Sequence, residues 1–181
     1  MKKTVLLLAF LAAIAGVLTL PALADSNTVS VSVTPMVVAV NVSPTSIDYG
    51  TLALSAADDS RMTAVSGNVA VKNTGSVAAD FKIRGSDATP LNPNDATWTL
   101  DCSSSTGLVG LNRYVHRFST SNPADFVGGG NTLCSDKDTM LSANIPVVGE
   151  TDVTFQMNMP TDSTGYSARS STVTVVVSAH Q

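Results

Sequence analysis

Apolar residues recur at every second position in several separate segments of this chain. Valines alternate with serines over residues 29–33, and the same period of two returns at 38–42, 69–71, 81–83, 153–159 and 173–177. Successive strand residues point to opposite faces of a sheet, so the pattern predicts strands with one apolar and one polar face. Residues 98–100 and 114–118 show a weaker form of it, and no segment sustains the 3.6-residue period of a helix.

Turn signals separate these segments. They are Ser43-Pro44, Asn73-Thr74-Gly75, Asn92-Pro93-Asn94-Asp95, Asn122-Pro123, Gly128-Gly129-Gly130 and Gly149. About seven to nine short strands with such punctuation predict an all-β fold, an antiparallel β-sandwich. Charged residues make up only 13% of the chain, and the many valines, threonines and serines suit strands better than helices.

Residues 1–24 predict a secretory signal peptide. Lys2 and Lys3 precede an apolar run, and small residues stand at both critical positions of Ala22-Leu23-Ala24. Cleavage there leaves residues 25–181, which we expect to reach the periplasm, the cell surface or the extracellular space. They carry 8 basic and 14 acidic residues, a net charge of −6, which argues against nucleic acid and anionic membranes as partners. No second apolar stretch is long enough to span a membrane.

Cys102 and Cys134 are the two cysteines of the chain. In an exported protein such a pair predicts one disulfide, closing a loop of about 32 residues and contributing roughly 3–4 kcal/mol to stability. The alternative is a reactive thiol pair, which the wide spacing and the lack of a Cys-x-x-Cys arrangement disfavour.

Two stretches resemble a known family. Residues 40–52 read VNVSPTSIDYGTL and residues 69–76 read VAVKNTGS, and together they resemble the immunoglobulin-like modules of the ASPM/SPD-2/Hydin type found in bacterial surface proteins. The aromatic-glycine pair of those modules is Tyr49-Gly50 here. Their Asn-Thr-Gly turn is Asn73-Thr74-Gly75, in which we expect Gly75 to be free to take a positive φ. The resemblance covers residues 40–84 and implies an immunoglobulin-like fold but no activity.

Residues 94–149 depart from that family pattern. The segment is long and glycine-rich and contains both cysteines, so we interpret it as a loop insertion stapled by the Cys102–Cys134 disulfide. The last strand candidate, 172–177, has a weaker likeness to the final strand of β-sandwich pilus subunits. Those subunits differ in their cysteine position and usually carry an aromatic residue next to the end, where this chain has His180.

No constellation of residues predicts catalysis, so we expect neither an enzyme nor a bound cofactor. His116 and His180 are the two histidines, and neither has a coherent acid–base partner in the sequence. We interpret His116 as a half-exposed strand residue and Trp98 as part of the core. Asp136 and Asp138 are weak candidates for a calcium site between loops, although their spacing does not match a calcium-binding loop.

Residues 25–36 precede the sandwich domain, which we expect to comprise residues 37–181. One interpretation is an edge strand of the same domain, with Pro35 at the crossover between sheets. The other is a donor strand, in which Val29, Val31 and Val33 complete the sheet of a neighbouring subunit. Such a head-to-tail contact does not close and therefore propagates into a filament.

The leading hypothesis is an exported, non-enzymatic structural protein of a surface or matrix, including a filament or pilus subunit. Its expected partners are further copies of itself or other proteins of the cell envelope. The alternative hypothesis is a monomeric ligand-binding module, which would hold carbohydrate or calcium with the loops between residues 92 and 138.

Overall fold

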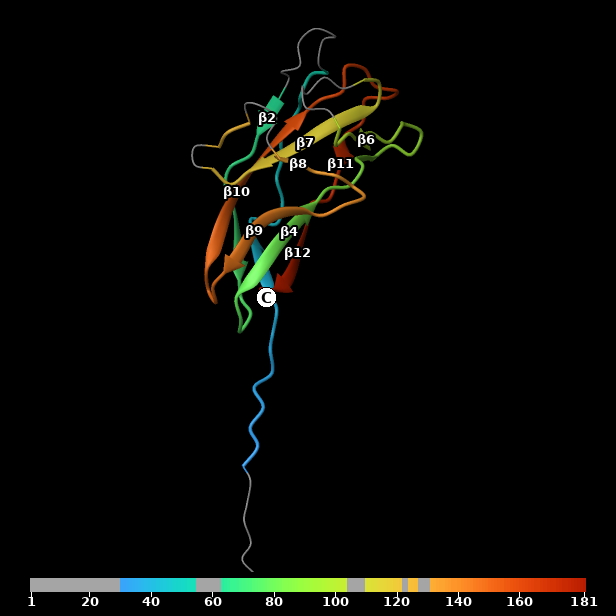
Figure 1. Ribbon diagram of the computed structural model, residues 1–181. Helices are drawn as coiled ribbons and strands as arrows, with labels where there is room; N and C mark the ends of the chain where they lie inside the picture. The colour runs from blue at the N-terminus through green and yellow to red at the C-terminus, as the bar shows by residue number, and fades with distance from the viewer. Residues whose placement is uncertain (1–29, 55–62, 104–109, 122–123, 127–130) are drawn as a thin grey trace, which may run out of the picture. The chain divides into compact units, whose positions relative to one another are not determined.

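The computed structural model describes residues 30–54, 63–103, 110–121, 124–126 and 131–181 (Figure 1). The chain divides into two compact units, Met1–Thr34 and Pro35–Gln181, and every strand of the described residues lies in the second unit. The described residues contain no helix, and therefore none that is long and apolar enough to cross a membrane. The prediction of an all-β fold is confirmed.

The larger sheet has the strand order β1-β3-β10-β7-β6, with β2 beside β10 and β8 beside β7. All of its pairs are antiparallel except β6 with β7. Its strands are β1 (Val40–Ser43), β2 (Thr63–Val65), β3 (Val69–Asn73), β6 (Thr99–Leu100), β7 (Arg113–Ser119), β8 (Asn131–Thr132) and β10 (Glu150–Asn158). The strand β10 pairs first with β3 and then with β2, so it joins the two halves of this sheet.

The second sheet has the order β12-β4-β9, built from β12 (Thr174–Ala179), β4 (Ala79–Arg84) and β9 (Thr139–Ile145) (Figure 1). The β12–β4 ladder runs in unbroken register along all six residues of β12. The β4–β9 ladder contains register shifts, which mark a bulge or irregularity. A small separate sheet pairs β5 (Thr89–Pro90) with β11 (Arg169–Ser170).

The two main sheets contribute their inward faces to one apolar core. Alternate residues of β3 and β4 are buried, as the period of two predicts, and they include Val71, Phe81 and Ile83. Other core residues come from β7, β9 and β10, namely Tyr114, Phe118, Leu141, Ile145, Val153 and Phe155. Burying a side chain of this size contributes about 1.5–3 kcal/mol. The architecture is therefore sandwich-like.

Two segments differ from the predicted alternation. Residues 114–119 of β7 are all buried, although the pattern predicted one polar face, and β7 has β10 on one edge and β6 and β8 on the other. His116 is accordingly buried, not half-exposed. Residues 30–33 lie outside any strand, while position 29 is not among the described residues.

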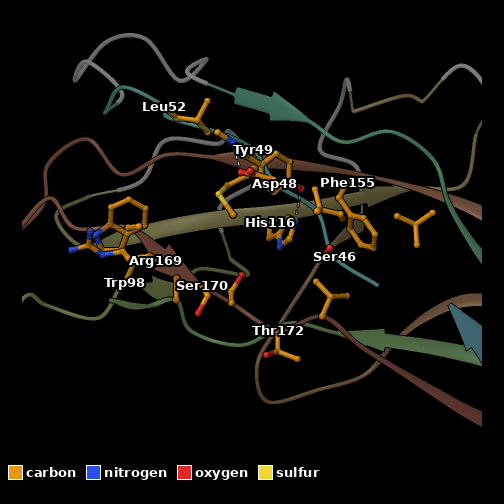
Figure 2. A pocket seen from close by; sticks show the side chains of 18 of the residues that line it. Ser46, Asp48, Tyr49, Leu52, Trp98, His116, Phe155, Arg169, Ser170 and Thr172 are labelled. Atoms are coloured by element: carbon orange, nitrogen blue, oxygen red, sulfur yellow. Dashed lines mark hydrogen bonds between the residues drawn. The ribbon is translucent and has the colours of Figure 1, made fainter. Parts of the chain in front are cut away.

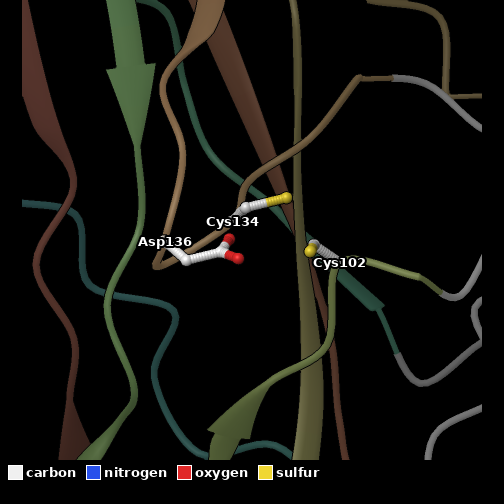
Figure 3. A group of neighbouring side chains, drawn as sticks. All are labelled: Cys102, Cys134 and Asp136. Atoms are coloured by element: carbon white, nitrogen blue, oxygen red, sulfur yellow. The ribbon is translucent and has the colours of Figure 1, made fainter.

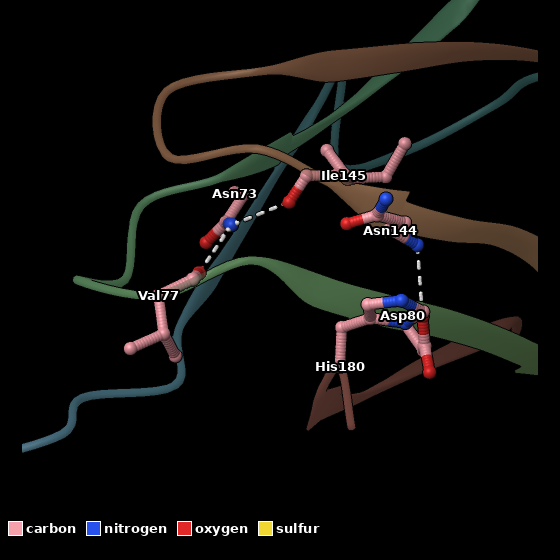
Figure 4. A network of polar contacts seen from close by, with 6 residues as sticks. All are labelled: Asn73, Val77, Asp80, Asn144, Ile145 and His180. Atoms are coloured by element: carbon pink, nitrogen blue, oxygen red, sulfur yellow. Dashed lines mark hydrogen bonds and ion pairs between the residues drawn. The ribbon is translucent and has the colours of Figure 1, made fainter.

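The side chain of Asn73 connects the turns at one end of the two sheets (Figure 4). Its amide nitrogen donates to the carbonyl oxygens of Val77 at 2.8 Å, Ile145 at 3.0 Å and Pro146 at 3.2 Å. Its Oδ1 accepts the backbone N–H of Gly75 at 2.9 Å. Because Asn73 ends β3 and Ile145 ends β9, this fully buried side chain binds the two sheets to each other.

Gly75 has a different role from the expected one. Its φ is not positive; among the described glycines only Gly50 and Gly165 have a positive φ. Instead, a Cβ at Gly75 would collide with the carbonyl oxygen of Val37. The backbone of Val37 accepts the Ser76 N–H at 2.9 Å, so the chain before β1 runs against this corner and leaves no room for a side chain.

A second polar contact joins all three strands of the smaller sheet (Figure 4). The carboxylate of Asp80 in β4 accepts the backbone N–H of Asn144 in β9 at 2.8 Å. The Nδ1 atom of His180, directly after β12, lies 2.7 Å from the same carboxylate oxygen. Asn144 has a φ of 53°, a left-handed conformation that asparagine tolerates better than most residues.

We predict that Asn73→Ala destabilises the protein by about 3 kcal/mol or more, because it leaves several buried carbonyl groups without a hydrogen-bond donor. The melting temperature should fall by about 6–12 °C for a chain of this size. Thermal unfolding followed by circular dichroism measures the change, and Asn41→Ala at an exposed position of β1 is the matched control. Equal melting temperatures for Asn73→Ala and the control would show that the amide does not join the sheets.

Candidate functional site

A cavity of about 1090 Å³ lies between β1 and β12 (Figure 2). Valines line it from both edges, Val40 and Val42 from β1 and Val175 from β12, and the side chains of Val71 and Phe155 reach it from the core. Two further segments contribute to the lining, the irregular residues 44–54 after β1 and residues 166–173 before β12, which include β11. The cavity is therefore mainly apolar and borders an edge strand of each sheet.

One polar contact in the lining of this cavity is the pair of Tyr49 and His116, and Asp48, Arg169 and several serines and threonines also line it (Figure 2). The Tyr49 hydroxyl lies 3.0 Å from Nε2 of His116, and the two rings meet edge to face with centroids 6.0 Å apart. Gly50 allows the segment to bend next to Tyr49, because its φ is 66°. The ring of Phe155 packs on His116 at 5.5 Å between centroids.

Burial determines the charge of both rings. It lowers the pKa of His116 to about 4, and its Nδ1 has no hydrogen-bond partner among the described residues. Burial also raises the pKa of Tyr49, and the neighbouring Tyr114 raises it further. At neutral pH both side chains are uncharged, so this pair offers a neutral polar contact and no acid–base couple poised near pH 7.

Trp98 lies at another part of the lining, where Arg169 covers its ring (Figure 2). The guanidinium carbon is 4.2 Å from the ring centroid, and the indole N–H donates to Ser163 Oγ at 2.8 Å. Arg169 also donates to the carbonyl oxygens of Ser167 at 2.8 Å and Ala96 at 3.1 Å. The interpretation of Trp98 as a core residue is confirmed, and Arg169 serves to hold the loops around it.

The two cysteines lie together, but the predicted disulfide is not formed in the structure (Figure 3). Cys102 and Cys134 are 2.7 Å apart, whereas a disulfide bond measures about 2.05 Å. Burial, together with the neighbouring Cys102, raises the pKa of Cys134 to about 12. A thiol with so high a pKa is a poor nucleophile at neutral pH, which speaks against Cys134 as an attacking thiol.

The two calcium candidates, Asp136 and Asp138, contact different side chains. A carboxylate oxygen of Asp136 lies within 4.8 Å of both cysteine sulfurs, a donor set softer than the all-oxygen set that calcium takes (Figure 3). Asp138 instead faces Arg84, with 3.8 Å between its carboxylate and the Arg84 Nε.

In the turn at residues 92–95, polar side chains accept hydrogen bonds from backbone N–H groups. The side-chain oxygen of Asn92 accepts the Asn94 N–H at 3.1 Å, and the Asp95 carboxylate accepts the Ser167 N–H at 2.9 Å. These contacts are those expected of asparagine and aspartate in a turn. They favour a structural role for this part of the region between residues 92 and 138.

The proposed donor residues are exposed where the structure describes them. Val31 is 81% and Val33 is 85% exposed, whereas Val29 lies outside the described residues. Met36, at 64%, is exposed as well. A row of apolar side chains left in solvent is a mark of an interaction surface.

Sequence reasoning did not identify the cavity or the contact of Tyr49 with His116, because 67 residues separate the two along the chain. One relevant feature can be read from the sequence: residues 174–179, TVVVSA, contain neither a charged residue nor a proline, the residues that commonly protect the edge of a sheet. Comparison with known proteins adds no assignment: no family model, no curated protein and no solved structure matches this chain.

We predict that the buried His116 makes stability depend on pH. Its pKa of about 4 lies below the value of about 6.5 in an unfolded chain, so the unfolded state binds the proton more tightly. The contribution is fully present above about pH 6.5 and is lost as the pH falls towards 4. At pH 4.5 about 2–3 kcal/mol of it has been lost.

Urea denaturation at pH 7 and at pH 4.5 measures how much the free energy of unfolding falls between the two. In His116→Gln this fall should be smaller by about 2–3 kcal/mol. An NMR titration of the His116 ring protons tests the same point directly. An unchanged pH dependence in His116→Gln would contradict the assignment.

Proposed function

We propose that this protein is an exported, non-enzymatic structural subunit that associates with further copies of itself by β-strand addition. The observation that carries the proposal is the outer edge of β12. This strand is the last in the second sheet, and among the described residues no strand pairs with its other side. The unpaired N–H and C=O groups of such an edge are a template for another strand.

The other sheet edges are better protected against strand addition. The strands β6 and β8 are two residues long, β2 has three residues, and β1 has four residues followed by Pro44. The β4–β9 ladder is irregular. Short strands, prolines, bulges and charges are the devices that protect edges, and β12 has six residues in regular register without any of them.

We further propose that the sandwich is immunoglobulin-like, as the resemblance implies. The order β1-β3-β10-β7 supports this, because it follows the A-B-E-D sheet of an immunoglobulin domain. In that scheme β4 takes the place of strand C and β12 that of strand F, whose outer neighbour is strand G. The chain departs from the scheme at β9, which comes after β7 in the sequence. The outer edge of β12 is then the place of a final strand.

The donor in this proposal is the extension before the domain. Residues 30–36 carry no charge, and the exposed Val31 and Val33 alternate with serines. Export is the expected setting, because residues 1–24 read as a signal peptide, and these residues lie outside those that the structure describes.

The proposal includes the Cys102–Cys134 disulfide of the exported form. The proximity of the two sulfurs supports it, since closing the bond needs a movement of well under 1 Å. Thiol–disulfide exchange with a partner disulfide would form it: the Cys102–Cys134 bond forms as the S–S bond of the partner breaks, and the partner leaves as a dithiol that carries the two electrons and two protons.

We predict that the protein recovered from an oxidising compartment has no free thiol, as measured by alkylation and mass spectrometry. Reduction should lower the free energy of unfolding by roughly 3–4 kcal/mol, because it frees a loop of about 32 residues in the unfolded chain. In the double variant Cys102→Ser/Cys134→Ser, the reductant should have no effect. Two alkylated cysteines in the exported protein would refute the disulfide.

We predict that the exported chain forms large oligomers or filaments, as seen by light scattering after size exclusion and by negative-stain microscopy. The variant Val31→Asp/Val33→Asp should remain a folded monomer, because strand addition would bury its charges.

Ser30→Asp/Ser32→Asp is the matched control, since it adds the same charge on the opposite face of the extension and should still assemble. A wild-type chain that stays monomeric at all concentrations, or an assembling Val31→Asp/Val33→Asp variant, would refute strand addition.

A further inference from the structure

The cavity between β1 and β12 leaves part of the apolar interior covered on one side only. Val40 and Val42 at one edge, and Val173 and Val175 at the other, pack against the core but are only half-buried. Along β12 the same place offers backbone groups that no described strand occupies. We call this place the acceptor groove: the cavity together with the outer edge of β12.

The extension matches the acceptor groove in chemistry. Residues 30–36 read SVSVTPM, so a strand formed by them has Val31 and Val33 on one face and Ser30 and Ser32 on the other. The valine face suits the apolar lining, and the serine face suits solvent. With no charged residue in this segment, insertion would bury no ion of the extension itself.

The extension also matches the groove in length. The six residues of β12 span about 20 Å and residues 30–34 about 17 Å, at roughly 3.3 Å per residue. Pro35 has no N–H group, so a ladder built by the extension ends before it. The uninterrupted run of backbone donors therefore covers most of the edge that β12 offers.

We propose that residues 30–34 of a second copy of this chain lie along the outer edge of β12, with Val31 and Val33 inserted into the cavity. The inference rests on the self-association proposed above, and it adds the cavity that receives Val31 and Val33 and the stretch of the extension that pairs with β12. A second copy is the partner because each chain carries one donor and one acceptor. In the single chain Val31 and Val33 are exposed while the groove walls are half-buried.

A mixing experiment tests the geometry, because a head-to-tail contact needs one intact donor and one intact acceptor. Val175→Arg places a charge in the groove, and Val31→Asp/Val33→Asp blocks the donor. Each variant alone should be monomeric, while an equimolar mixture should give a one-to-one dimer and nothing larger by light scattering. Leu91→Arg is the matched control, since Leu91 is 74% exposed and outside the cavity lining, and this variant should assemble like the wild type.

A binding experiment keeps the test decisive if Val175→Arg does not fold. A synthetic peptide of residues 25–36 should bind the donor-blocked chain one to one, as measured by calorimetry, and a peptide with Val31→Asp/Val33→Asp should bind about tenfold more weakly or worse. If Val175→Arg folds, as judged by circular dichroism, it should lose peptide affinity to a similar extent.

The outcomes separate the two proposals. A wild-type chain that does not associate refutes the proposed function. Association that persists in a folded Val175→Arg variant, or a mixture without dimers, refutes the groove as the acceptor and leaves self-association standing. A monomeric wild-type chain that is destabilised by Val31→Asp/Val33→Asp would show that the extension pairs within its own copy, which refutes both. A peptide that fails to bind the donor-blocked chain refutes the groove.

Discussion

The buried amide of Asn73 is the interaction on which the arrangement of the two sheets depends. It lies at the end of β3, in the larger sheet, and donates to backbone carbonyls that flank β4 and β9, in the smaller one. A leucine of similar volume would leave these carbonyls unsatisfied, and no apolar contact could reproduce the directions in which the amide donates. Apolar packing holds the faces together, but it is non-directional, and the amide determines which turns meet.

The corner at Asn73 joins the two sheets, whereas at the edges formed by β1 and β12 no described strand joins them. The core residues Val71, Phe81 and Ile83 are fully buried, so the centre of the sandwich is complete without this edge. The chain leaves the larger sheet at Pro44, and residues 44–54 line the cavity without forming a strand. The domain can therefore hold its fold although, among the described residues, no strand pairs with the outer edge of β12.

The sequence predicts the local features of this fold well. The period of two located the strands at 69–71, 81–83 and 173–177, because alternation is a property of each strand by itself. It failed for β7, where residues 114–119 are all buried, since burial there depends on neighbouring elements and not on the strand itself. The resemblance pointed to Asn73 and Gly75, but the reason for Gly75 is a close approach of Val37, which only the three-dimensional structure reveals.

The candidate site was less predictable, because each of its parts depends on pairing between distant segments. The exposed valines of the extension were visible in the sequence, whereas the open edge of β12 follows from its pairing with β4, about a hundred residues earlier. The two cysteines could be recognised as a pair, and their approach to 2.7 Å brings Asp136 with them, a neighbour that no spacing rule indicated.

The alternation of the extension also bears on the specificity of strand addition. A shift by one residue along β12 would turn Ser30 and Ser32 towards the cavity and Val31 and Val33 towards solvent. Such a register would bury hydroxyl groups in an apolar lining and leave the valines exposed, so it is disfavoured on both counts. A shift by two residues keeps the correct face inward but moves Pro35 into the ladder or shortens the pairing. In the proposed contact, alternation and Pro35 together would limit the extension to few registers, which would distinguish a specific subunit contact from general edge-to-edge aggregation.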